Sequence, residues 1–301
     1  MRWRFDHPVL LLSLTTLFWA GNWIVGRAFR DDVPPIALSF FRWNVALACV
    51  LPLAWEELKT HEALVRRHWK ILFFLGALGT ALYNALTYIG LQTTTATNGV
   101  LLNSFIPIVI VAINWLALRR QPSAIAIVGI AISFVGVMAI VARGSFANLT
   151  TLAFNVGDIW IIASVFGWAI YTICLRLRPA ELPPMATLAV LAAAGLVVMA
   201  PAFLFEWLVL GRTTNPTGAA MAGILYTGIF PAFLGYIFWN RAVAEIGSEQ
   251  AGLYIHLMPV FGIVLSSVFL GEHPQGFHFA GIALILAGIA LTSRRPVAIQ
   301  P

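Results

Sequence analysis

Apolar residues run through this sequence in blocks of about 20, and this block length limits what the chain can fold into. A helix needs about 20 apolar residues to cross a bilayer, whereas a transmembrane β-strand needs about 10 with alternating polarity. Charged residues make up only 10% of the chain, against about 25% in soluble domains. The pattern predicts an all-α polytopic membrane protein and excludes a soluble enzyme, a disordered chain and a nucleic-acid binder.

Ten such blocks are separated by connections too short to hold a soluble domain. The predicted spans are residues 9–28, 34–54, 69–92, 95–118, 123–142, 155–177, 184–210, 217–242, 249–270 and 277–293. The longest connection is 55–68, which is rich in charged residues. The first block is longer than the core of a signal peptide and no A-x-A cleavage site follows it, so it is predicted to remain as the first span.

Lys and Arg are unevenly divided between the two sets of connections. The set that includes the N-terminus holds thirteen of the 18 basic residues, the opposite set holds four, and Arg42 lies inside the second span. The positive-inside rule then places both termini in the cytoplasm, with the protein in the plasma (inner) membrane and the 143–154 connection outside. The net charge of +6 therefore reflects topology and a lipid bilayer partner, and does not indicate a nucleic acid.

The two halves of the chain resemble each other at a steady spacing. Matched residues lie 149 positions apart early in each half and 152 apart later: Trp19 and Trp168, Arg27 and Arg176, Pro34 and Pro183, Pro107 and Pro259, Gly129 and Gly281, Gly136 and Gly288. Each half holds five spans, an odd number, so the second copy enters the membrane in the opposite sense. We assign the first repeat to 1–143 and the second to 144–301, an inverted-repeat plan common among secondary transporters.

Two segments carry a family resemblance. Ten spans in two five-span halves resemble the drug/metabolite transporter superfamily, EamA type, and LGEHPQGFHFAGIALILAGIAL at 270–291 resembles the end of an EamA repeat. The copy at 118–140 is weaker, with Arg119-Arg120 where the family pattern has Gly-Glu. In length and aromatic content the chain looks most like the YddG-type exporters of aromatic and other amino acids. The resemblance implies export of small metabolites from the cytoplasm without an organic cofactor.

Paired prolines mark two of the predicted spans. Pro107 and Pro259 fall near the middle of 95–118 and 249–270, where each would free the backbone carbonyl four residues earlier, that of Asn103 or Ile255. Unsatisfied backbone at membrane depth is tolerated only against protein or water. The prolines therefore predict either packing kinks or a paired acceptor site that lines a cavity and acts in gating.

Polar and aromatic residues at helical spacing predict the faces that line a central cavity. The candidate substrate-binding residues are Trp19, Asn22, Tyr83, Asn84, Tyr88, Asn103, Ser104, Trp168, Tyr171, Tyr254 and His256. The ionisable candidates for a charge role are Arg42, Asp158 and Glu206. For the aromatics and for His256 the alternative is an ordinary buried packing role.

The predicted cavity contains no cluster of carboxylates and no cluster of Lys or Arg, so it suits zwitterions with apolar side chains, namely amino acids. The ammonium would meet aromatic ring faces and the carbonyls of Asn103 and Ile255. The carboxylate would meet one of four candidate groups: Asn22, Asn84, His256 or Arg42. Another small metabolite or a drug is the alternative cargo.

Two other classes of protein fit the sequence less well. An intramembrane metalloprotease needs a second His three residues after His61-Glu62, where Val65 stands, and the sequence has no Cys/His cluster for a metal. A channel would need a ring of charges or carbonyls, usually built by oligomerisation. We therefore expect a transporter rather than an enzyme, with no metal or cofactor; the sequence leaves the oligomeric state open.

Single-cysteine labelling tests the predicted topology. In a background lacking Cys49 and Cys174, a cysteine at position 148 should react with a membrane-impermeant maleimide added from outside, because 143–154 is predicted to be external. Reaction only from the cytoplasmic side would contradict the prediction.

Overall fold

The computed structural model describes residues 7–145, 147, 155–270 and 273–293, and throughout these residues it is helical without a β-strand. Position 148 of the labelling prediction and Gly271-Glu272 of the predicted Leu-Gly-Glu segment lie outside the described residues. The expectation of an all-α membrane fold is confirmed. Over the described residues, eight helices are long and apolar enough to cross a membrane, and α16 is a shorter apolar helix.

The helices follow the predicted spans to within a few residues, apart from an extension after the second span. In the first half they are α1 (Pro8–Ala28), α2 (Pro35–Thr60), α3 (Glu62–Arg67), α4 (Trp69–Leu75), η1 (Gly76–Leu82), α5 (Tyr83–Thr93), α6 (Ala96–Asn103), α7 (Ile106–Leu116) and α8 (Ala124–Val141). In the second half they are α10 (Val156–Cys174), η2 (Leu175–Leu177), α11 (Pro184–Leu204), η3 (Phe205–Val209), α12 (Gly218–Thr227), η4 (Gly228–Leu234), α13 (Gly235–Ile246), α14 (Ser248–Leu253), η5 (Tyr254–His256), α15 (Leu257–Leu270) and α16 (Gly276–Ser293).

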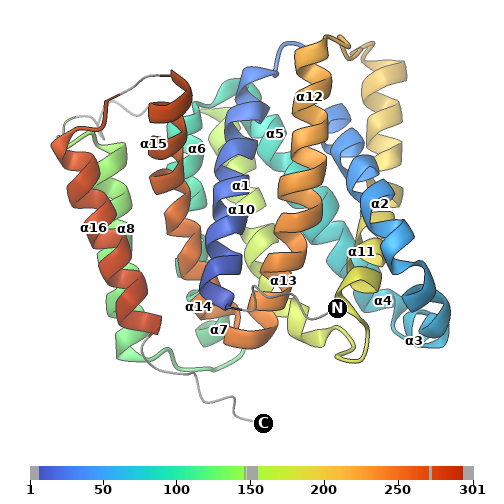
Figure 1. Ribbon diagram of the computed structural model, residues 1–301, viewed down its shortest axis with the longest axis horizontal. Helices are drawn as coiled ribbons and strands as arrows, with labels where there is room; N and C mark the ends of the chain where they lie inside the picture. Colours follow the sequence, from blue (N-terminus) through green and yellow to red (C-terminus); the bar gives the residue numbers. More distant parts are fainter. Residues whose placement is uncertain (1–6, 146, 148–154, 271–272, 294–301) are drawn as a thin grey trace.

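The long helices stand side by side in one bundle. Helices α8 and α16 pair at one edge, and α2, α3 and α4 lie at the opposite edge (Figure 1). Between them, α1 and α10 pack against α13 and α5 respectively. The middle of the bundle is thus built from both halves of the chain.

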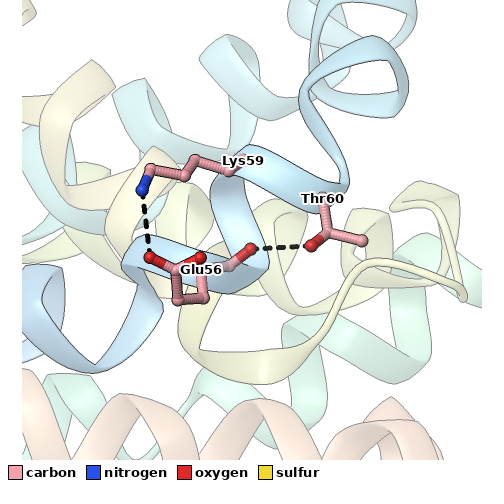
Figure 2. Close-up of polar contacts among 3 residues, drawn as sticks. All are labelled: Glu56, Lys59 and Thr60. Atoms are coloured by element: carbon pink, nitrogen blue, oxygen red, sulfur yellow. Dashed lines mark hydrogen bonds and ion pairs between the residues drawn. The ribbon is translucent and has the colours of Figure 1, made fainter.

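The 55–68 connection is largely helical. Helix α2 continues to Thr60 and α3 follows from Glu62. Lys59 donates to the Glu56 carboxylate at 3.0 Å, and the Thr60 hydroxyl donates to the Glu56 carbonyl at 2.9 Å (Figure 2). Glu, Leu and Lys have high helix propensity, so the segment stays helical where its side chains are exposed.

Helices α2 and α11 cap each other at opposite ends. The Glu206 carboxylate, just after α11, accepts from the backbone N–H groups of Ile36 at 3.3 Å and Ala37 at 2.8 Å, in the first turn of α2. The Glu57 carboxylate, near the end of α2, accepts from the N–H of Ala186 at 3.1 Å, in the first turn of α11. Both the glutamates and the alanines are 149 residues apart, and the exchange shows that the two helices run antiparallel.

The same π-helical turn occurs in both halves. Segments η1 and η4 are each seven residues long and begin 152 positions apart. A Cβ added to Gly76, the first residue of η1, would lie 2.7 Å from the Leu191 carbonyl oxygen of α11, and one added to Gly228 of η4 would lie 2.9 Å from the Arg42 carbonyl oxygen of α2. Each π-turn therefore packs against the second long helix of the opposite half, which only glycine at these positions allows.

Glycines also bring α8 and α16 into backbone contact. A Cβ added to Gly136 would lie 2.6 Å from the Gly281 carbonyl oxygen, and one added to Gly288 would lie 2.4 Å from the Gly129 carbonyl oxygen. Small residues permit this close approach in membranes, where van der Waals packing drives helix association.

Replacing these glycines tests the α8–α16 contact. Gly136→Ala and Gly288→Ala should each lower the free energy of unfolding by about 1–3 kcal/mol, the usual cost of overpacking, because the neighbouring atom is backbone. The thermal midpoint of the purified protein in detergent measures this loss. Gly262→Ala is the matched helical control, since nothing lies within 4 Å of its added Cβ. An equal midpoint for all three variants would show that the contact contributes nothing.

Candidate substrate site

A cluster of aromatic side chains fills the middle of the bundle. Trp19 of α1 and Trp168 of α10 meet edge to face, with ring centroids 4.9 Å apart and planes at 89°. Tyr83 and Tyr171 contact Trp168 at 4.6 Å and 5.1 Å. We call the following set the central aromatic cluster: Trp19, Tyr83, Trp168, Tyr171, Tyr236 and Trp239.

Four members of this cluster are among the candidates predicted from sequence, and two are not. Tyr236 and Trp239 of α13 each contact both Trp19 and Trp168. Helical spacing already puts both on the polar face of the predicted span 217–242, and Tyr236 follows Asn84 by 152 residues, although neither is in the list of candidate substrate-binding residues.

The polar atoms of the cluster reach carbonyls of the two π-turns. Trp19 Nε1 donates to the carbonyl of Pro231 in η4 at 3.1 Å, and the Tyr236 hydroxyl donates to the carbonyl of Gly79 in η1. Pro231 and Gly79 are 152 residues apart, so equivalent carbonyls accept aromatic donors from opposite halves. A π-turn shifts the backbone hydrogen bonds and commonly occurs at functional sites.

Arg42 is buried beside this cluster with an exposed fraction of 1%. Its Nη1 donates to the side-chain oxygens of Asn22 at 3.0 Å, Asn84 at 2.9 Å and Tyr88 at 2.7 Å. The Tyr88 hydroxyl donates in turn to Asn22 Oδ1 at 2.6 Å. We call these four residues the Arg42 network. It unites three predicted substrate-binding residues with one predicted charge residue.

The Arg42 network joins the aromatic cluster through Asn84, whose Nδ2 lies 3.0 Å from the Tyr236 hydroxyl. A related contact occurs in the second half, where the Tyr171 hydroxyl donates to Asn240 Oδ1 at 2.7 Å. Asn240 follows Tyr88 by 152 residues and Tyr171 follows Asn22 by 149, so the tyrosine and asparagine exchange places between halves. The two central polar pairs are equivalent, although only one includes an arginine.

Both paired prolines stand in the first turn of a helix, next to a local change in the helical backbone. Helix α6 ends at Asn103 and α7 starts at Ile106, so Pro107 stands in the first turn of α7. Pro259 likewise stands in the first turn of α15, after η5. Proline lacks an N–H and is tolerated in the first turn of a helix, where no intrahelical bond is needed.

His256 ties the two helix breaks together. Its Nε2 lies 2.9 Å from the Ser104 carbonyl oxygen, and its Nδ1 lies 2.6 Å from the hydroxyl of Ser133 on α8. A carbonyl only accepts, so Nε2 carries the hydrogen. Asn103 joins the same region, since Tyr83 donates to its side-chain oxygen at 3.2 Å, and Tyr254 is buried within η5.

Asp158 and Glu206 both have capping contacts. Asp158 forms a capping box with Asn155 at the start of α10 and accepts from the Thr94 hydroxyl. Glu206 caps α2 as described above. A carboxylate is a strong acceptor at a helix N-terminus, where it also meets the positive end of the helix dipole. Both residues lie at helix ends, and among the described residues neither forms a hydrogen bond with the central aromatic cluster or the Arg42 network.

The centre of the bundle is packed shut in this structure. Trp168 and Tyr171 have no exposed surface, and Tyr236 has 1%. A pocket of about 430 Å³ lies elsewhere, at the start of α2 and the end of α5. Glu206 is the only residue of the predicted set that lines it. Access to the central residues therefore requires the surrounding helices to separate.

Comparison with known proteins shows a family to which the sequence is similar in both halves. The sequence profile of the EamA-like transporter family matches residues 7–142 and again 155–294. An uncharacterized transporter of Archaeoglobus fulgidus is 29% identical, covering 95% of this chain and 97% of that one. A probable terminal-alkyne amino-acid exporter of Streptantibioticus cattleyicolor is 28% identical, covering 97% and 95%. A solved crystal structure with a TM-score of 0.76 and 17% identity covers 95% of this chain and 96% of its own, which shows the fold alone.

Replacing either proline tests the importance of the helix breaks. Pro107→Ala and Pro259→Ala should each reduce transport more than folding, because the restored N–H can recapture the carbonyl four residues back and fuse the two helices. Initial transport rates and thermal midpoints of the same preparations separate the two effects. Pro201→Ala, a proline inside α11, serves as the comparison. Unchanged rates in both paired variants would refute the role.

Proposed function

Since the chain belongs to the EamA-like transporter family, we propose that it exports small metabolites from the cytoplasm, foremost neutral amino acids with aromatic or other apolar side chains. The observation that carries this proposal is the central aromatic cluster, in which Trp19 and Trp168 of opposite halves meet edge to face. The similarity to a probable terminal-alkyne amino-acid exporter supports the same class of cargo.

The cluster and its surroundings suit an amino acid in two ways. Aromatic faces bind apolar side chains and attract an ammonium group. The indole N–H groups of Trp168 and Trp239 are buried without a hydrogen-bond partner, which leaves donors for a polar substrate atom. In this proposal Tyr83, Trp168 and Tyr171 contact the substrate side chain, and Asn103 and Ser104 lie at the helix break beside it.

Alternating access between two inverted repeats supplies the mechanism. The reciprocal caps of α2 and α11 support this plan, as do the repeated π-turns, because each contact recurs with the halves exchanged. Opening toward one side and toward the other then involves equivalent rearrangements of equivalent helices. The membrane is the plasma membrane, with both termini in the cytoplasm, as the distribution of basic residues predicts.

We favour facilitated movement of the substrate down its own gradient. Proton coupling usually employs an ionisable group that is exposed alternately to both sides. Asp158 and Glu206 both serve as helix caps, and both ring nitrogens of His256 have partners. An exporter working on an abundant cytoplasmic pool needs neither tight binding nor a second gradient.

Amino-acid flux in proteoliposomes tests the function. Purified protein should mediate saturable counterflow of L-phenylalanine that persists without a pH gradient. Trp168→Ala should reduce the initial rate by about tenfold, because a lost aromatic contact is worth about 1.4 kcal/mol. Failure of neutral amino acids to exchange would refute the cargo, and accumulation only with an imposed proton gradient would refute the facilitated mechanism.

Two further variants separate lost binding from lost packing. Trp168→Phe keeps a ring in the cluster and should retain more flux than Trp168→Ala. Trp69→Ala removes an indole that is 56% exposed at the start of α4, and it should leave the rate unchanged. Equal losses in Trp69→Ala and Trp168→Ala would point to a general effect on stability.

A further inference from the structure

Arg42 is a buried cation whose hydrogen-bond partners are all neutral. Among the described residues it forms no ion pair, and its three hydrogen bonds go to two amide oxygens and one hydroxyl. An uncompensated charge inside a membrane segment is costly, and such residues usually mark substrate pathways. The missing anion is therefore the feature to be explained.

The fold itself does not require a cation at this place. Leu191 of α11 stands 149 residues after Arg42, at the equivalent position of the second half. Both backbones pack in the same way, against the first glycine of the opposite π-turn. Leu191 is fully buried there. Since an apolar side chain fills the equivalent place, Arg42 serves a purpose other than helix packing.

The guanidinium is held at one nitrogen only. Its three hydrogen bonds within the described part of the chain all involve Nη1, whereas Nε is buried and has no partner there. Arginine carries five N–H donors in a rigid fork, and two parallel N–H groups match the two oxygens of a carboxylate. The network thus fixes the orientation of Arg42 while the edge formed by Nε and Nη2 takes no part in those bonds.

Other unpaired groups nearby are also donors. The indole nitrogens of Trp43, Trp168 and Trp239 are buried without hydrogen-bond partners, like Nε of Arg42. The Trp43 ring lies 5.8 Å from the Arg42 guanidinium carbon and 4.8 Å from the Tyr236 ring, so the cation borders the aromatic cluster. Thr172 Oγ1 on α10 is also buried without a partner and can donate or accept. The unpaired nitrogens are all N–H donors, and they favour a ligand that brings acceptors.

We propose that Arg42 is the carboxylate receptor of the transport site, binding the substrate through Nε and Nη2 while Asn22, Asn84 and Tyr88 position the guanidinium. The inference rests on the proposed function and chooses among the four groups left open by the sequence. The amide nitrogen of Asn84 already donates to the carbonyls of Gly79 and Thr80, and both ring nitrogens of His256 are engaged elsewhere. Asn22 offers only a neutral amide, whereas Arg42 offers charged donors, which form the stronger hydrogen bonds to a carboxylate. The substrate class is therefore small carboxylates with an apolar or aromatic side chain, including amino acids. It excludes compounds of the same shape in which the carboxylate is absent or replaced by an amide.

An acid and its amide of the same shape provide the test on wild-type protein. Binding of 3-phenylpropanoate and 3-phenylpropanamide to the purified transporter is measured by the ligand-dependent shift of its thermal midpoint. The acid should bind at least about tenfold more tightly, because hydrogen bonds to a charged group are the stronger kind. Equal affinities for the acid and the amide would overturn the inference.

Variants of the network assign the preference to Arg42. Arg42→Gln should abolish the acid preference, and Arg42→Lys, which keeps the charge without the fork, should retain only part of it. Asn22→Asp places a carboxylate against Nη1, so the protein should become more stable without ligand while the acid preference falls. Asn22→Asp replaces only one side-chain group, the amide nitrogen, by an oxygen. It therefore still tests the acid preference if Arg42→Gln fails to fold. An acid preference that survives in Asn22→Asp or Arg42→Gln would contradict the assignment.

Flux of L-phenylalanine and of phenethylamine distinguishes this inference from the proposed function. If L-phenylalanine is not transported but the acid preference depends on Arg42, the amino-acid proposal fails and the carboxylate receptor stands. If both compounds are transported at equal rates, the exporter stands and the receptor fails. Transport of L-phenylalanine but not of phenethylamine supports both the amino-acid exporter and the carboxylate receptor.

Discussion

The first turn of a helix leaves backbone N–H groups without partners in the helix itself, so other groups of the protein have to accept from them. Helices α2 and α11 meet this requirement through each other: Glu57 of one caps the start of the other, and Glu206 returns the contact. The caps place the two helices antiparallel and in register. The π-turns then pack on these helices, and the aromatic cluster in turn donates to carbonyls of the π-turns.

The features that the two halves share form the framework of the bundle. The positions at which the halves differ include the one that carries the buried charge. Glycine contacts, π-turns and the central tryptophans recur in both halves. Arg42 and Leu191 share a backbone environment but differ in charge, so the first half has a buried cation where the second half has a buried leucine. This asymmetry suits a substrate with one charged end and one apolar end.

The spans, the duplication and much of the central residue set could be predicted from the sequence, because block length and helical spacing reflect contact with lipid and with the core. Partners could not. Arg42 bonds to residues 20, 42 and 46 positions away, and periodicity identifies the face of a helix without identifying what that face meets. Pro107 illustrates another limit, since a proline inside an apolar block is compatible with both a bend and a break. The helices of the 55–68 segment could not be predicted from hydropathy, because the segment is rich in charged residues, as exposed connections are.

The reciprocal glutamate caps also bear on how such a chain could arise. A five-helix half on its own would carry an uncapped helix start and a glutamate with no helix to cap. Two copies of one half, inserted in opposite directions, would supply each other with both contacts.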